Sequence, residues 1–159
     1  MRGVYTANYR IAGVTTAKTL FYITAPSTGL IDILSTIVTN ESNETNEQMA
    51  VCWQRITTLG TPTATTVTPA KNEKGDQAAQ GTYKANVTAS EPTYGASAQG
   101  AALVDMHGLQ GAPSLSGYMH GPTPEERRTI APSDTWGLRL LNNITSADLT
   151  IEVVVQEKG

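Results

Sequence analysis

Charged side chains are scarce in this sequence. Asp, Glu, Lys and Arg make up 16% of its 159 residues, whereas an average soluble domain carries about a quarter. That share is too low for a helical bundle, and the net charge of −3 is too low for a disordered chain. No basic stripe is present either, because Glu125-Glu126 directly precedes the one basic pair, Arg127-Arg128. We therefore expect a folded protein that does not bind nucleic acid.

Cysteine and histidine, which carry much nucleophilic and metal chemistry, are also rare. Cys52 is the only cysteine, and its apolar surroundings, "MAVCWQRI", predict a buried, unreactive thiol. The two histidines, His107 and His120, do not form the His-x-His pair of cupin metalloenzymes. Asp105 and His107 share a strand face, but two solvated histidines are the favoured interpretation. The acidic stretch "KNEKGDQ" (71–77) lacks the ligand spacing of a calcium loop.

Other catalytic signatures are missing as well. The chain has no Gly-x-Ser-x-Gly elbow, no phosphate-binding loop and no dinucleotide-binding glycine pattern. The paired carboxylates of a glycosidase stay open, but such enzymes line their clefts with aromatic residues, which are only 6% here. We predict a protein that is not an enzyme and that holds no metal or cofactor.

Long hydrophobic runs are absent too. No stretch approaches the length of a membrane span, and the N-terminal "MRGVYTANYRIAGV" has neither the apolar core nor the cleavage site of a secretory signal. We expect no membrane association and no secretion.

Strand patterns dominate what remains. Apolar and polar residues alternate with a period of two, and turn residues separate the runs. The main runs are residues 4–12, 19–25, 30–40, 48–59, 82–89, 100–109, 134–143 and 148–157. They predict one all-β domain over residues 1–159, a jelly roll or β-sandwich of roughly eight antiparallel strands with long loops.

Two long segments interrupt the strands, residues 60–81 and 110–132. The first overlaps "TVTPAKNEKGDQAAQGTY" (66–83), which has almost nothing to bury. Neither half of the chain alone supplies enough strands for a stable sandwich, so this segment is predicted to be a loop within one domain and not a linker. In the second, Thr123 as N-cap and Pro124 after it predict one or two helical turns over 122–130.

The alternation also assigns side chains to faces. Trp53 and Trp136 fall in strand runs and are predicted to pack in the core. In the run 30–40, strict alternation places one set of residues on a single face: Ile31, Ile33, Ser35, Ile37 and Thr39.

The stretch from Gln54 to Tyr83 has a distinctive series of turns. A strand ends in Arg-x-Thr-Thr, a Gly-Thr-Pro-Thr turn follows, and a Thr-Pro step leads to a polar loop with Gly-Asp and small residues. Near the C-terminus, "WGLRL" (136–140) precedes a short polar turn and a last strand that ends in "VVVQE". These features resemble the jelly-roll head decoration proteins of tailed bacteriophages. The resemblance covers the middle and last parts of the chain well and the N-terminal strands loosely. The matching residues of the first series are Arg55, Thr57, Thr58, Gly60, Thr61, Pro69, Gly75, Asp76, Ala78 and Ala79.

The resemblance implies a structural virion protein, a cement protein on the capsid exterior that assembles in the host bacterial cytoplasm. Its partners would be the major capsid protein and further copies of itself, as a homotrimer. Contacts are expected from an N-terminal arm (1–9) and from the loops 60–81 and 110–124. The candidate contact residues are Arg2, Val4, Tyr5, Lys71, Asn72, Glu73 and Tyr118.

An alternative function is a receptor- or carbohydrate-binding module of a phage fibre or spike. Glycan-binding modules present exposed aromatic rings, and with both tryptophans in the core, this leaves Tyr83, Tyr94 and Tyr118 as platforms. The main coat protein of a small virus is disfavoured, because the chain lacks a basic arm.

Overall fold

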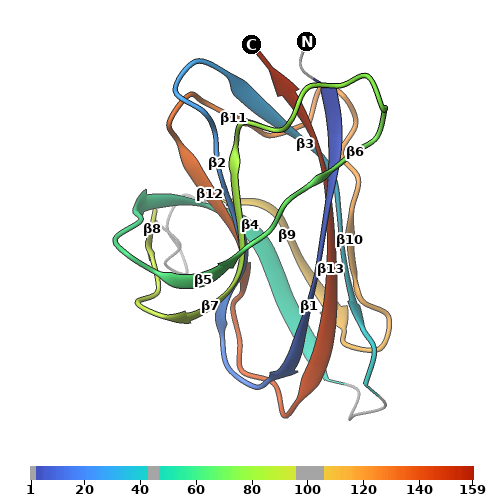
Figure 1. Cartoon of the computed structure of the whole chain (residues 1–159). Coiled ribbons are helices and arrows are strands. Elements are labelled where there is room, and N and C mark those ends of the chain that lie inside the picture. The colour runs from blue at the N-terminus through green and yellow to red at the C-terminus, as the bar shows by residue number, and fades with distance from the viewer. Residues whose placement is uncertain (1–2, 43–46, 96–105) are drawn as a thin grey trace.

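The computed structural model describes residues 3–42, 47–95 and 106–159, and within these ranges the chain is all-β, without a helix. Two antiparallel sheets pack face to face (Figure 1). This arrangement confirms the predicted fold class. The strands are β1 (Gly3–Val14), β2 (Lys18–Thr24), β3 (Leu30–Asn40), β4 (Gln48–Thr58), β5 (Thr63–Thr66), β6 (Ala70–Lys71), β7 (Thr82–Ala89), β8 (Thr93–Tyr94), β9 (Met106–Pro113), β10 (Tyr118–His120), β11 (Thr129–Ile130), β12 (Thr135–Leu140) and β13 (Ala147–Lys158).

Eight of these strands have the topology of a jelly roll. The first sheet contains the order β10-β3-β13-β1, and the second contains β2-β12-β4, with β9 paired to the other side of β4. The chain crosses between the sheets from β1 to β2, β2 to β3, β3 to β4, β9 to β10, β10 to β12 and β12 to β13. This is the path of a doubled Greek key.

The core lies between the inner faces of the two sheets, and β13 shows the alternation that builds it. Its inward residues Leu149, Ile151, Val153 and Val155 are fully buried, and each contributes about 1.5–3 kcal/mol on transfer from water. Trp53 and Trp136 belong to the same core cluster, as predicted. Cys52 is buried and unpaired, and its burial raises the pKa of the thiol to about 11.

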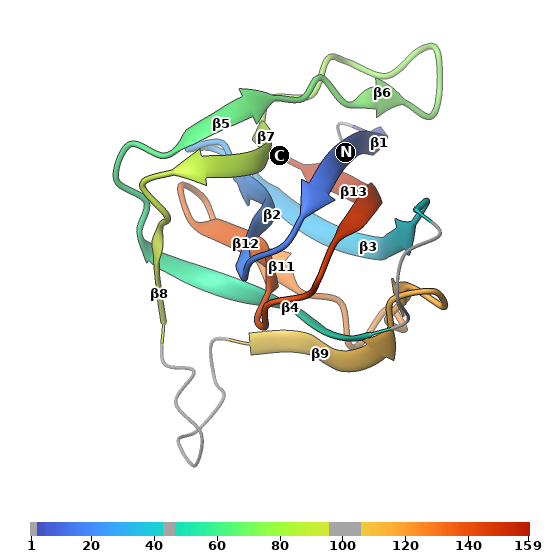
Figure 2. The same ribbon diagram turned by 90° about the horizontal axis from the view of Figure 1, so that it is seen from below.

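The segment between β4 and β9 adds strands to both sheets. In Figure 2 the chain runs from β5, beside β7, across to β6, beside β1. β7 pairs with β2 and widens the second sheet. The predicted loop 60–81 contains two short strands, β5 and β6. A second apolar cluster of Tyr22, Ile56 and Val87 forms outside the main core. Ile56 of β4 is buried in this cluster, and β4 has buried side chains on both of its faces.

The face assignment in β3 is wrong beyond residue 33. Val155 pairs with Ile33 and Val154 pairs with Ser35, so Leu34 is an extra residue in a β-bulge. The bulge reverses the alternation, and Thr36 and Val38 are the buried side chains after it.

The predicted N-terminal arm is wrong for the residues described. β1 pairs with β13 from Gly3↔Glu157 to Val14↔Ala147, which makes it an integral strand of the first sheet. Its inward residues Tyr5, Ala7 and Ile11 are buried. The free energy gained by burying these side chains exceeds the conformational entropy that an unattached arm would keep.

The predicted helix at 122–130 is a single turn. The backbone N–H and the hydroxyl of Thr123 donate to the Glu126 carboxylate at 3.3 and 3.0 Å, which is cap-like chemistry. No helical periodicity follows to extend the turn, and β11 begins at Thr129. The predicted loop 110–132 is likewise interrupted, by the end of β9, β10 and β11.

Candidate functional site

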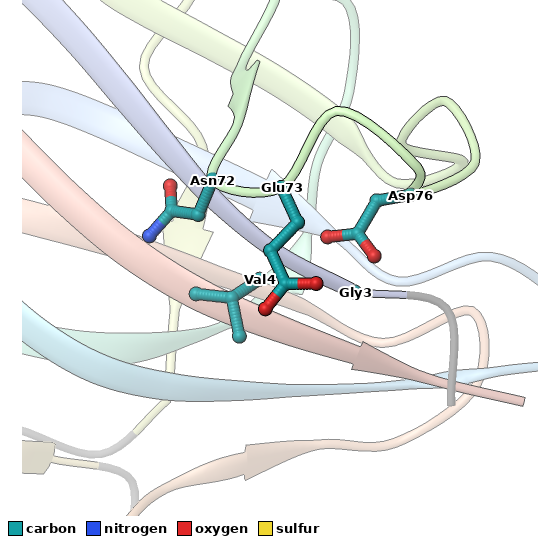
Figure 3. Close-up of a pocket in the computed structure, with 5 residues that line it drawn as sticks. All are labelled: Gly3, Val4, Asn72, Glu73 and Asp76. Carbon is teal, nitrogen blue, oxygen red and sulfur yellow. The ribbon is translucent and has the colours of Figure 1, made fainter.

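An open niche lies where the segment after β6 meets the beginning of β1. It has a volume of about 330 Å³. Figure 3 shows the Asn72, Glu73 and Asp76 side chains of this segment above the backbone of β1. The residues that line the niche are Gly3, Val4, Asn72, Glu73 and Asp76.

One wall of the niche is attached to β1 by sheet pairing. Lys71 pairs with Tyr5, and the Asn72 N–H donates to the Val4 carbonyl at 2.9 Å. The Thr6 hydroxyl donates to the Asn72 side-chain oxygen at 2.8 Å. These contacts place Asn72 at the free edge of β1, where an uncovered strand would otherwise offer its backbone to another chain.

The second half of the loop is held by buried polar groups of the first sheet. The Tyr5 hydroxyl donates to the Gln77 carbonyl at 2.8 Å. The carboxylate of Glu157, which is fully buried in β13, accepts the N–H groups of Gln80 and Gly81 at 2.9 and 2.8 Å. A buried carboxylate is costly unless hydrogen bonds satisfy it. Glu157 therefore needs the N–H groups of the loop, and the loop is held in place by the carboxylate.

Tyr83 completes the set of donors to Glu157. Its hydroxyl lies 2.8 Å from the carboxylate oxygen. Burial raises the pKa of Tyr83, and the neighbouring Glu157 charge raises it further, so the hydroxyl keeps its proton and stays a donor. The loop 72–81 is therefore fixed at both of its ends.

The exposed rim of the niche is acidic. Glu73 and Asp76 are joined by a turn in which the Asp76 N–H donates to the Glu73 carbonyl at 3.1 Å. A side chain at Gly3, whose φ is +146°, would place its Cβ 2.4 Å from an Asp76 carboxylate oxygen. Only glycine allows this close approach. Two carboxylates and an amide beside the Val4 methyl groups suit a cationic side chain of a protein partner.

The structure brings together some of the predicted contact residues and excludes others. Val4, Asn72 and Glu73 line the niche, and Lys71 is exposed next to it. Tyr5 and Tyr118 were wrong predictions as surface contacts, since both rings face the core and are 0% and 1% exposed. Arg2 and Asp105 lie outside the described residues. The prediction missed Asp76, although the Gly75-Asp76 step in a polar loop was a usable signal.

The proposed glycan platforms are mostly part of the interior. Tyr83 and Tyr118 are almost fully buried. Tyr94 is partly buried, with the Arg139 guanidinium 4.1 Å from its ring centre and its hydroxyl 2.5 Å from the Thr19 hydroxyl. The rings that would stack on a sugar are thus occupied by contacts within the protein.

A second hollow, of about 390 Å³, lies at the ends of β4 and β12. Two of its lining residues, Arg55 and Asp134, form an ion pair at 3.1 Å. Arg55 and Thr57 belong to the series of turns that resembles decoration proteins. Here the arginine has a structural partner, which accounts for its position without a ligand.

The described residues contain no helix that is both long and apolar enough to cross a membrane. Comparisons with protein-family models, with curated proteins and with solved structures found no match for this chain.

Proposed function

We propose that this chain is a structural protein of a bacteriophage head, which binds the lattice of major capsid protein from outside and stabilises it. The observation that carries the proposal is the loop 72–81, which is exposed at its tip and yet pinned to the first sheet from both ends. A loop that is already ordered in the free protein loses little conformational entropy on binding, and this favours its use as a contact with another protein.

The mechanism follows from mass action. A protein that binds only the expanded lattice stabilises that state, and many copies on one shell add up modest individual affinities. The acidic rim of the niche would take a Lys or Arg side chain of the capsid protein. Assembly in the host cytoplasm and a position on the virion exterior are parts of the same proposal.

Self-association as a homotrimer is the second part of the proposal. Three large apolar side chains are exposed on β9, β10 and the turn between them: Leu109, Leu115 and Met119, at 50%, 55% and 71%. Exposed large apolar side chains on neighbouring segments are candidates for a protein interface. The turn lies within the loop 110–124 that the sequence predicted as a contact.

Co-sedimentation with expanded heads that lack this protein tests the capsid contact. The wild type should pellet with the heads. Glu73→Lys combined with Asp76→Lys should bind at least about tenfold more weakly, because the rim charge is reversed. Glu125→Lys is the control for the reversal of a surface charge outside the niche, since Glu125 is exposed near the opposite edge of the first sheet.

Three outcomes separate the parts of the proposal. A wild type that fails to pellet at any salt concentration overturns capsid decoration. A double variant that binds as well as the wild type excludes the niche as the contact. Light scattering of the free protein should give a trimer, and a strict monomer contradicts the self-association.

A further inference from the structure

The two histidines of the chain, distant from the niche, meet where the outer strands of the two sheets approach each other. His107 lies on β9 of the second sheet, and His120 lies on β10 of the first (Figure 1). Their Nε2 atoms are 3.0 Å apart, and their ring planes are 83° apart, with 4.8 Å between the centroids. Both side chains are partly exposed, so the pair is accessible to a small solute.

The backbone around the pair is arranged to bring the rings together. Gly108 has a φ of +64°, and a Cβ there would lie 2.8 Å from the Tyr118 hydroxyl oxygen and 3.0 Å from the His120 ring. The Tyr118 hydroxyl donates to the Gly108 carbonyl at 2.8 Å, and its ring stacks beside His120 at 6.4 Å. The bond between Tyr118 and Gly108 and the strand pairing of His107 with Trp53 thus hold β10 and β9 in place independently of the contact between the two histidine rings.

The electrostatic environment keeps both imidazoles neutral at neutral pH. Partial burial lowers the pKa of His107 to about 4, with His120 and Arg128 acting in the same direction and Glu126 opposing them. Burial also lowers the pKa of His120, again against Glu126.

We propose that His107 and His120 form a two-histidine site for a divalent transition-metal ion of the Zn²⁺, Ni²⁺ or Cu²⁺ type. Two imidazole nitrogens at about 2.0–2.1 Å from one ion, in neighbouring coordination positions, lie about 2.9–3.4 Å apart, which includes the observed distance. The described residues contain no group of three or more His, Cys, Asp or Glu that could hold a metal, so water fills the other positions.

An ion held in this way would connect β9 to β10 and hence the second sheet to the first. Binding to the folded chain alone stabilises it through linkage. The site goes beyond the proposed capsid contact and does not depend on it, because neither histidine belongs to the niche. Both histidines lie on β9 and β10, the strands that also carry Leu109 and Met119 of the proposed self-association.

Isothermal titration calorimetry with ZnCl₂ at pH 7 tests the site. The chain suits this experiment, since it has no other histidine and its one cysteine is buried. We expect one ion per chain and a higher melting temperature with Zn²⁺. His107→Gln and His120→Gln should each weaken binding by more than about tenfold. Even the loss of a residue that only hydrogen-bonds to a metal ligand lowers metal affinity by at least about tenfold. Glu73→Gln combined with Asp76→Asn is the control for carboxylate binding and should bind like the wild type.

Electron paramagnetic resonance of the wild type with Cu²⁺ keeps the test independent of variant folding. Two imidazole nitrogens should split the copper signal. The proposal is overturned if the wild type does not bind Zn²⁺, or if both histidine variants bind it as tightly as the wild type does. A copper spectrum without coupling to two nitrogens also overturns it.

Discussion

Trp53 forms a direct link between the two sheets. Its indole N–H donates to the Thr36 hydroxyl at 2.9 Å, from β4 in one sheet to β3 in the other, and both side chains are fully buried. The ring supplies apolar area, and the single hydrogen bond satisfies its one polar atom. Thr36 occupies this inward position because of the bulge at Leu34.

Replacement of Trp53 by alanine should therefore lower the free energy of unfolding by about 3–5 kcal/mol, through lost burial and the cavity left behind. Thr36→Val keeps the volume and leaves the indole N–H without its partner, which should cost about 1–3 kcal/mol. Urea unfolding followed by circular dichroism measures both values. A loss below about 1 kcal/mol for Trp53→Ala would show that the ring contributes little to the core.

At the scale of elements, the loop 72–81 has a fixed conformation although its own sequence offers almost nothing to bury. Its conformation depends on groups of the first sheet, namely the hydroxyl of Tyr5 and the carboxylate of Glu157. The strand β6 and the bond between Asn72 and Val4 secure the beginning of the loop. A polar loop can thus be ordered by buried polar partners.

Glu157→Gln should loosen this loop. The amide keeps one acceptor oxygen but turns an NH₂ group toward donors that need an acceptor, so stability should fall by about 1–3 kcal/mol. Hydrogen exchange should become faster at the amides of Gln80 and Gly81. Glu152→Gln, in the same strand but partly exposed, is the control and should leave exchange at these amides unchanged. Unchanged exchange in Glu157→Gln would mean that the loop is ordered without this carboxylate.

The strands and the attachment of the loop differ in how far the sequence predicts them. The expected runs 30–40 and 82–89 coincide with β3 and β7, because local alternation and turn residues specify them. The bulge at Leu34 was missed, since one extra residue leaves no signature in a strand that is apolar on both sides. Val4, Asn72 and Glu73 were named from the sequence as separate candidate contacts, but their meeting in one niche was not predicted, because nothing local joins residue 4 to residue 72.

At the scale of the whole molecule, one core connects both sheets. The main cluster contains inward residues of β1, β3 and β13 from the first sheet and of β2, β4 and β12 from the second. The inserted segment contributes Val67, Tyr83 and Ala85 to the same cluster. A shared core of this kind couples the unfolding of all its strands.

We therefore expect a single cooperative unfolding transition for the chain. Both tryptophans lie in this core, so their fluorescence should report the same midpoint as far-ultraviolet circular dichroism, at one protein concentration. The calorimetric and van't Hoff enthalpies should also agree. Separate midpoints for the two probes would show that the inserted strands unfold on their own.

The sequence by itself determined the class of fold, the main strands, the buried tryptophans and the buried cysteine. These features follow from period-two alternation, turn residues and composition, which act over a few neighbouring residues. The tertiary structure alone decided that β1 is an inner strand and not an arm, that Glu157 holds the loop at Gln80, and that His107 meets His120. The physical reason is that strand pairing and buried polar contacts join residues far apart in the chain, and their register depends on bulges and on the packing of the whole sandwich.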